Sequence, residues 1–151
     1  STRDGIFELP STKVGTMICF EVAVDDISRD LVHSGATLLI AQTNNSDFGR
    51  TNESTQQLAI ARLRAIETGR VFVNISTVGT SAIIYPNGTD SQQLPTYQAA
   101  MMQEELPLRT SITPAMAIGG SLEIANNFSA LAQIAFVVFM RLRGRRVKAS
   151  E

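Results

Sequence analysis

The sequence predicts an α/β fold: a layered sandwich with a mixed sheet, followed by one helix that spans a membrane. Three observations predict it. Short apolar runs alternate with stretches of helical periodicity over residues 1–113, as in repeated strand–helix units. Two further apolar runs then follow each other with no helix between them, which indicates a hairpin. Residues 114–151 contain a long apolar stretch followed by a basic cluster.

The first strand is predicted at Val14–Ile18. A short helix follows at Asp25–Ser34, with apolar side chains on one face and Gly35 as its stop. Ala36–Ala41 is a continuous apolar run, which fits a strand that is covered on both faces. Gln42–Arg50 is rich in Asn, Ser and Gly, and it is predicted to be a loop.

A longer helix is predicted at Ser54–Thr68, where apolar side chains recur with helical spacing. Ser54 and Gln57 have the spacing of a capping box, which predicts the start of the helix. Gly69 is expected to end it.

Two strands are predicted after this helix, at Val71–Ile75 and Thr80–Tyr85, and the turn at residues 86–88 closes the second. A last strand is predicted at Glu105–Thr110. Pro107 confines that strand to an edge or a bulge of the sheet, because proline has no N–H to donate.

The tail has the length and charge pattern of a transmembrane helix. Ile118–Met140 is about as long as the roughly 20 residues that span a bilayer. Arginines and a lysine follow it directly, which marks a cytoplasmic flank under the positive-inside rule. The alternative is an amphipathic or core helix with a solvated basic end. The basic residues are Arg141, Arg143, Arg145, Arg146 and Lys148.

Composition excludes several classes of function. The net charge is −1 and there is no Trp, so neither a basic surface nor an aromatic platform for nucleic acid is expected. The chain has one cysteine and one histidine, Cys19 and His33, so neither a disulfide nor a zinc site is expected.

Cys19 is the candidate nucleophile. It follows an apolar strand and precedes Asp25 and Asp26, which fit a helix start. A thiol at a strand-to-helix turn is held rigidly, with backbone N–H groups nearby for an oxyanion. The alternative is an inert, buried cysteine that packs as a small hydrophobe.

Four motifs in order resemble the nitrilase, or carbon–nitrogen hydrolase, superfamily. They also resemble its branch of membrane N-acyltransferases that modify bacterial lipoproteins. Ile18–Glu21 is similar to the family's cysteine elbow, and Thr43–Gly49 to the loop after the next strand. Gln57–Arg70 resembles the long helix. Asn74–Gly79 and then Ser81–Gly88 resemble two paired strands.

The resemblance implies that residues 1–113 are the C-terminal part of a nitrilase-like α/β/β/α sandwich. Residues 114–151 would be a transmembrane helix with a cytoplasmic tail. The family uses a Glu–Lys–Cys triad whose Glu and Lys lie well before the cysteine. Glu8 is too close to Cys19, Lys13 lies on the elbow's own strand, and Lys148 lies in the tail. The isolated chain is therefore expected to be inactive.

The resemblance also implies roles for single residues and partners, and it implies no cofactor. Cys19 would carry an acyl thioester taken from a phospholipid and pass it to the diacylglyceryl-cysteine of a lipoprotein. The backbone N–H of Phe20 would bind the oxyanion. Glu21 would orient the site, although a carboxylate there also fits a helix cap.

Asn44, Asn45 and Phe48 are expected to line the substrate pocket. Asp47 stands where the family often has a tryptophan that holds lipid, and Phe48 is expected to replace it in that role. The charged residues of the long helix are interpreted as structural, with Arg64 and Glu67 paired three positions apart. Two other functions stay open: a soluble amidase of the same superfamily, and a non-catalytic interaction domain with an inert Cys19.

Overall fold

The computed structural model describes residues 5–148, with side chains for residues 5–141. The tail residues Arg143, Arg145, Arg146 and Lys148 therefore have no described side chains. The strands are β1 (Ile6–Leu9), β2 (Thr12–Ile18), β3 (Leu38–Thr43), β4 (Val71–Ser76), β5 (Ala82–Ile84) and β6 (Asp90–Gln93). The helices are α1 (Asp25–His33), α2 (Glu53–Thr68) and α3 (Pro114–Lys148), and the 3₁₀ turns are η1 (Cys19–Ala23) and η2 (Ser46–Phe48).

The six strands form one mixed sheet in the order of the sequence. The central strands β2, β3 and β4 are parallel, while β1, β5 and β6 pair antiparallel with their neighbours. Helices α1 and α2 make the two parallel crossovers. The carboxyl ends of β2, β3 and β4 therefore lie at one edge of the sheet, where ligands bind in open α/β sheets.

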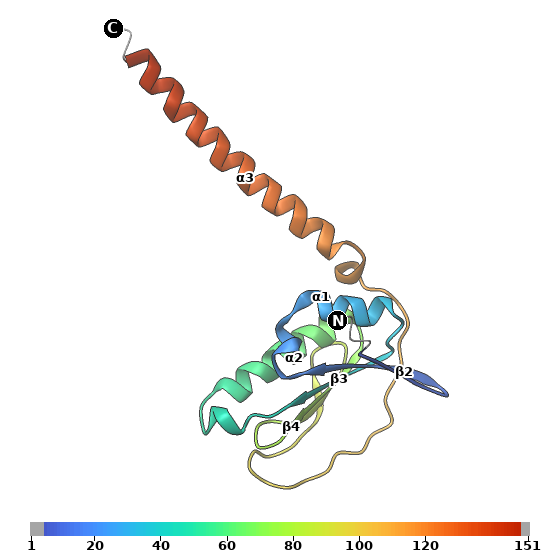
Figure 1. Ribbon diagram of the computed structural model, residues 1–151. Coiled ribbons are helices and arrows are strands. Elements are labelled where there is room, and N and C mark those ends of the chain that lie inside the picture. The colour runs from blue at the N-terminus through green and yellow to red at the C-terminus, as the bar shows by residue number, and fades with distance from the viewer. Residues whose placement is uncertain (1–4, 149–151) are drawn as a thin grey trace. The chain divides into compact units, whose positions relative to one another are not determined.

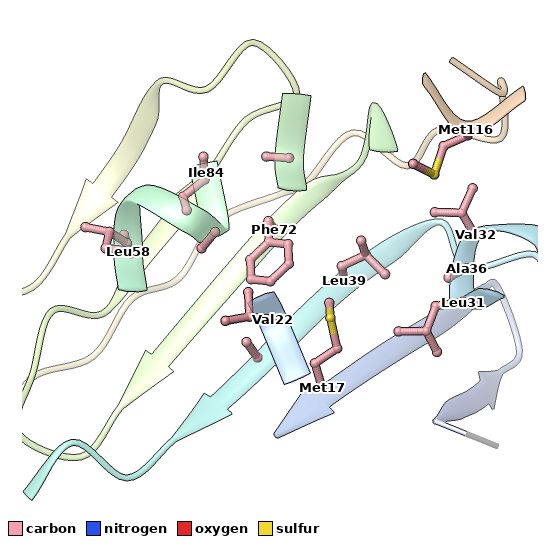
Figure 2. Close-up of a cluster of buried hydrophobic side chains, with 14 residues drawn as sticks. Met17, Val22, Leu31, Val32, Ala36, Leu39, Leu58, Phe72, Ile84 and Met116 are labelled. Atoms are coloured by element: carbon pink, nitrogen blue, oxygen red, sulfur yellow. The ribbon is translucent and has the colours of Figure 1, made fainter. Parts of the chain in front are cut away.

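The core lies between the sheet and helices α1 and α2, which share one side of it (Figure 1). Met17, Leu39 and Phe72 project from three neighbouring strands toward the helices, and Val22 of η1 packs among them (Figure 2). The period of two along each strand selects these residues. The sequence patterns that predicted the central strands and both helices are thus confirmed.

The opposite face of the sheet is also apolar. Ile18 is 55% exposed and Ile75 is 43% exposed on this side. The segment after β6 lies along part of the face, where Val73 and Ile83 line a cavity of about 350 Å³ together with Leu94.

The strand predicted at Glu105–Thr110 is wrong, because the whole segment between β6 and α3 is irregular. Pro107 cannot donate to a strand partner. Side chains fix the segment instead. Glu104 accepts hydrogen bonds from Tyr85 and Ser91, and Arg70 donates to the carbonyl of Ser111 at 2.7 Å.

The capping box predicted for α2 is also wrong. The helix begins at Glu53, with Asn52 before it. The Ser54 hydroxyl accepts a hydrogen bond from the Thr80 N–H at 2.9 Å, and the Gln57 side chain reaches partners outside the helix. A long-range contact therefore uses the residues that the local pattern assigned to a cap.

The chain divides into two compact units, one ending at Met116 and one beginning at Ala117. Met116 belongs to the core of the first unit, which explains the division inside α3. The Pro114–Arg141 part of α3 is long enough and apolar enough to cross a membrane. Its most apolar stretch is not buried in the described structure.

Candidate active site

Cys19 lies at a sharp turn between β2 and η1. Its φ angle is +52°, in the left-handed region that non-glycine residues rarely adopt. Such a conformation costs about 1–3 kcal/mol and is found preferentially at functional sites. The residue is partly exposed. The turn thus holds the thiol in one direction at the carboxyl edge of the sheet.

Glu21 and Phe20 complete the turn. A carboxylate oxygen of Glu21 accepts a hydrogen bond from the Ile18 N–H at 2.7 Å, so this side chain caps η1. The Phe20 side chain is exposed. The Glu21 carboxylate therefore stabilises the strand-to-helix turn.

Glu8 and Lys13 lie away from Cys19, near the opposite end of β2, and they bind each other at 2.6 Å. The ion pair lowers the pKa of Glu8. A strand of seven residues is about 20 Å long, which keeps both groups out of reach of the thiol.

The residues predicted to line the pocket separate into two groups. Asn44 is exposed, and its side-chain oxygen accepts a hydrogen bond from the Thr77 hydroxyl at 3.0 Å. It lines an open depression of about 350 Å³ at the carboxyl ends of β3 and β4. Phe48 is partly exposed in η2. Asn45 is buried, so its side chain stabilises the loop by contacts within the protein and does not face the depression.

A hydrogen-bond relay connects this loop with the elbow. The Gly79 N–H donates to the Ser76 hydroxyl at 2.8 Å, and that hydroxyl donates to the side-chain oxygen of Asn45. The Asn45 amide donates to the Gln57 side-chain oxygen at 2.8 Å. The Gln57 amide then donates to the Cys19 carbonyl at 3.2 Å. The relay therefore links β4, the loop, α2 and the elbow.

Arg64 holds the other end of η1. Its Nε donates to the Val22 carbonyl at 2.8 Å, and a terminal nitrogen donates to the Ala23 carbonyl at 3.0 Å. Burial opposes the charge, but hydrogen bonds to Asp25 and Glu67 outweigh this effect and raise the pKa of Arg64. The predicted pair of Arg64 and Glu67 is confirmed.

Arg70 is buried. It donates a hydrogen bond to the Ala36 carbonyl, just before β3, at 2.8 Å and another to the Ser111 carbonyl, between β6 and α3, at 2.7 Å. Burial, together with repulsion from Arg109, lowers its pKa. This arginine therefore fixes backbone segments, as the structural interpretation of the helix charges predicts.

Sequence reasoning missed Gln57 and Ser76 as parts of the site. Gln57 lies 38 residues from Cys19 in sequence, and no local pattern reports a contact over that separation. The one available signal was polarity: Gln57 is a polar residue at a position of α2 that faces the core. In the described part of the chain, no group of three His, Cys, Asp or Glu residues is arranged to hold a metal ion.

The fold and the elbow define a class of α/β proteins that carry a cysteine at a strained strand-to-helix turn. The carbon–nitrogen hydrolase family model matches residues 1–112, and the chain belongs to this family. The family prediction made from the sequence is confirmed.

Curated relatives of this chain carry the name apolipoprotein N-acyltransferase. The one from Mycolicibacterium smegmatis is 35% identical over 114 residues, which cover 76% of this chain and 19% of the relative. The one from Shewanella oneidensis is 36% identical over 67% of this chain and 20% of its own length. The one from Chromobacterium violaceum is 29% identical over 95% of this chain and 28% of its own length. The matched part of the chain thus spans between about a fifth and just over a quarter of the length of these relatives.

Solved structures show the same fold at low identity. A branch 10 member of the nitrilase superfamily from Saccharomyces cerevisiae has a TM-score of 0.54 and 16% identity, over 64% of this chain and 38% of that one. A nitrilase-superfamily amidase from Nesterenkonia has a TM-score of 0.50 and 17% identity, over 60% of this chain and 37% of that one. The predicted nitrilase-like α/β fold class is confirmed.

Proposed function

We propose that this chain is the nucleophile-bearing part of a bacterial membrane N-acyltransferase. The enzyme transfers a fatty acyl chain from a phospholipid to the N-terminal amine of a diacylglyceryl-cysteine on a lipoprotein. The observation that carries the proposal is the strained elbow at Cys19 in a chain whose relatives bear that name. The partial exposure of Cys19 supports attack on a substrate over an inert, buried thiol.

In the first half-reaction the Cys19 thiolate attacks the ester carbonyl of the phospholipid. A C–S bond forms, and the carbonyl oxygen becomes an oxyanion that accepts a hydrogen bond from the Phe20 N–H. The intermediate then collapses to a thioester. The lysophospholipid leaves as an alcohol with a proton from a carboxylic acid, which was the general base for the thiol.

In the second half-reaction the lipoprotein amine attacks the thioester carbonyl. A C–N bond forms, the C–S bond breaks, and the amine proton returns to the general base. The base and a lysine that stabilises the oxyanion belong to residues outside this chain, because Glu8 and Lys13 bind each other away from the elbow. The isolated 151 residues are accordingly inactive.

The remaining residues have supporting roles in this proposal. Glu21 orients the elbow through its bond to the Ile18 N–H. Asn44 and Phe48 contact substrate, while Asn45 holds the loop in place. Residues 1–113 act as part of the catalytic domain outside the cytoplasm. Residues 114–151 are the membrane anchor, whose basic end lies in the cytoplasm.

The test uses the full-length protein that carries these residues, in detergent micelles. It is incubated with a phospholipid that has a labelled acyl chain, in the absence of acceptor. A label on Cys19 that hydroxylamine releases, detected by mass spectrometry, is the expected result. The Cys19→Ala variant is the matched control and should take up no label.

Three results would contradict the proposal or a part of it. Hydrolysis of small amides with no labelled thioester would identify a nitrilase-type amidase instead. A folded protein with neither activity, in which Cys19 resists alkylation, would identify a non-catalytic domain. Acyl transfer by the isolated 151 residues would show that the base lies within this chain.

A further inference from the structure

The relay from Gly79 to Cys19 has a fixed direction, because both of its ends are backbone groups. It begins at an N–H, which can only donate, and it ends at a carbonyl, which can only accept. The orientations of the side chains between them follow from these two ends. The Asn45 oxygen faces Ser76, and the Gln57 nitrogen faces Cys19. Turning over the Gln57 amide would lose two hydrogen bonds, and turning over the Asn45 amide would lose its bond to Gln57.

Burial makes this direction costly to change. Asn45 and Gln57 are both buried, and a buried polar group without a partner costs about 1–3 kcal/mol. Every hydrogen bond of the relay supports the next one, as in other buried polar networks. The Gln57 amide is therefore a fixed donor aimed at one carbonyl oxygen.

That carbonyl belongs to the peptide unit between Cys19 and Phe20. A trans peptide is planar, so its C=O and its N–H point in opposite directions. Gln57 binds the C=O from the side of α2, and the N–H of Phe20 therefore points away from α2. The first N–H groups of a helix have no acceptor within the helix, which leaves this donor for a substrate oxygen.

We propose that Gln57 is a positioning residue that fixes the direction of the Phe20 N–H as oxyanion donor. This inference rests on the proposed function, in which that N–H binds the oxyanion of both half-reactions. Gln57 touches neither the substrate nor the thiol in this arrangement. It acts by preventing rotation of one peptide plane, and the relay behind it holds its amide in place.

The test compares two reactions of Cys19 in the full-length protein. Thioester formation from a phospholipid passes through an oxyanion, while alkylation by iodoacetamide displaces iodide and forms none. In Gln57→Leu we expect the rate of thioester formation to fall by about 10²-fold, because misplacing one donor costs that much. The KM for phospholipid and the alkylation rate should stay within about threefold of the wild type. Gln56→Leu, a change at the exposed neighbouring position, is the matched control.

A second variant adds a pH signature. In Gln57→Glu the carboxylate repels the Cys19 carbonyl, and it becomes a donor only when it is protonated. The activity of this variant relative to the wild type should therefore rise as the pH falls. A purely structural role for Gln57 would change the alkylation rate of this variant, relative to the wild type, with pH as strongly as the acylation rate.

The outcomes separate this inference from the proposed function. A wild-type thioester with an unchanged rate in Gln57→Leu would overturn the inference and leave the function standing. Equal losses of alkylation and acylation would overturn it as well, since Gln57 would then only hold the fold. A wild-type protein that cleaves amides would overturn the proposal that phospholipid is the substrate. The role of Gln57 would then be tested by the same comparison of rates, with an amide as the substrate. A wild type with neither activity would overturn both.

Discussion

Ser76 shows how one hydroxyl can support a distant thiol. It accepts from the Gly79 N–H and donates to Asn45, so it fills two roles in the relay. Ser76→Ala leaves a donor and an acceptor unsatisfied near the core. We expect the free energy of unfolding to fall by about 1–3 kcal/mol, measured by denaturant unfolding in detergent.

The matched control is Ser46→Ala. The Ser46 hydroxyl also donates to an asparagine oxygen, that of Asn44, but on the exposed surface. Its loss should change the free energy of unfolding by no more than about 0.5 kcal/mol. Similar losses in both variants would contradict the importance of burial in the relay.

At the residue scale, the sequence predicted the candidate nucleophile, Cys19, but not the residues that hold its turn in place. Cys19 stands alone after an apolar strand, and that local pattern is visible in the string. Ser54 and Gln57 have the spacing of a capping box. In the structure Gln57 instead donates to the Cys19 carbonyl, and Ser54 accepts from the Thr80 N–H. A local pattern cannot distinguish these cases, because they differ only in which distant backbone approaches the helix.

Helix α2 provides a comparison between two arginines two positions apart. The Arg64 side chain is 8% exposed and binds carbonyls of η1, whereas the Arg62 side chain is 33% exposed and pairs with Asp90. Arg64→Ala should lower the free energy of unfolding by about 2–4 kcal/mol, because buried carbonyls lose a charged donor. Arg62→Ala should lower it by at most about 1 kcal/mol, as for other partly exposed ion pairs. Thermal and denaturant unfolding would measure both, and equal effects would contradict this assignment.

The segment between β6 and α3 depends on one carboxylate. Hydrogen bonds from Ser91 and then Tyr85 hold the pKa of Glu104 below its ordinary value of 4.5. A lowered pKa stabilises the folded state above the unfolded value, and this stabilisation is lost as the pH falls through the folded value. The protection factors of amides in residues 94–113, which compare the observed exchange with the intrinsic rate at the same pH, should therefore fall below pH 4.5. The Glu104→Gln variant should lose this pH dependence. A pH dependence that is unchanged in the variant would show that a group other than Glu104 causes it.

At the scale of elements, prediction succeeded where burial imposes a period. The central strands and both core helices have apolar faces that pack together, and their spacing follows from that packing. The edge strands β1 and β6 were missed. β6 (Asp90–Gln93) is polar throughout, and its pairing with β5 is not reflected in any apolar period.

At the scale of the whole molecule, α3 should behave as a membrane span. Leu131→Arg places a charge near the middle of Pro114–Arg141, and a central arginine raises the cost of insertion by about 2.5–3.5 kcal/mol. The variant should be depleted from membranes after an alkaline carbonate wash, and Leu131→Ile should remain. Equal retention of both variants would contradict a spanning α3.

The second face of the sheet has a practical consequence for work with this protein. Ile18 and Ile75 expose apolar surface on the unit that ends at Met116. Parallel strands normally have both faces covered, and large uncovered apolar patches cause association. A version shortened to residues 1–120 would therefore remain prone to self-association at millimolar concentration. Light scattering during purification would measure this self-association. Removal of the hydrophobic tail would not by itself give a monomeric sample.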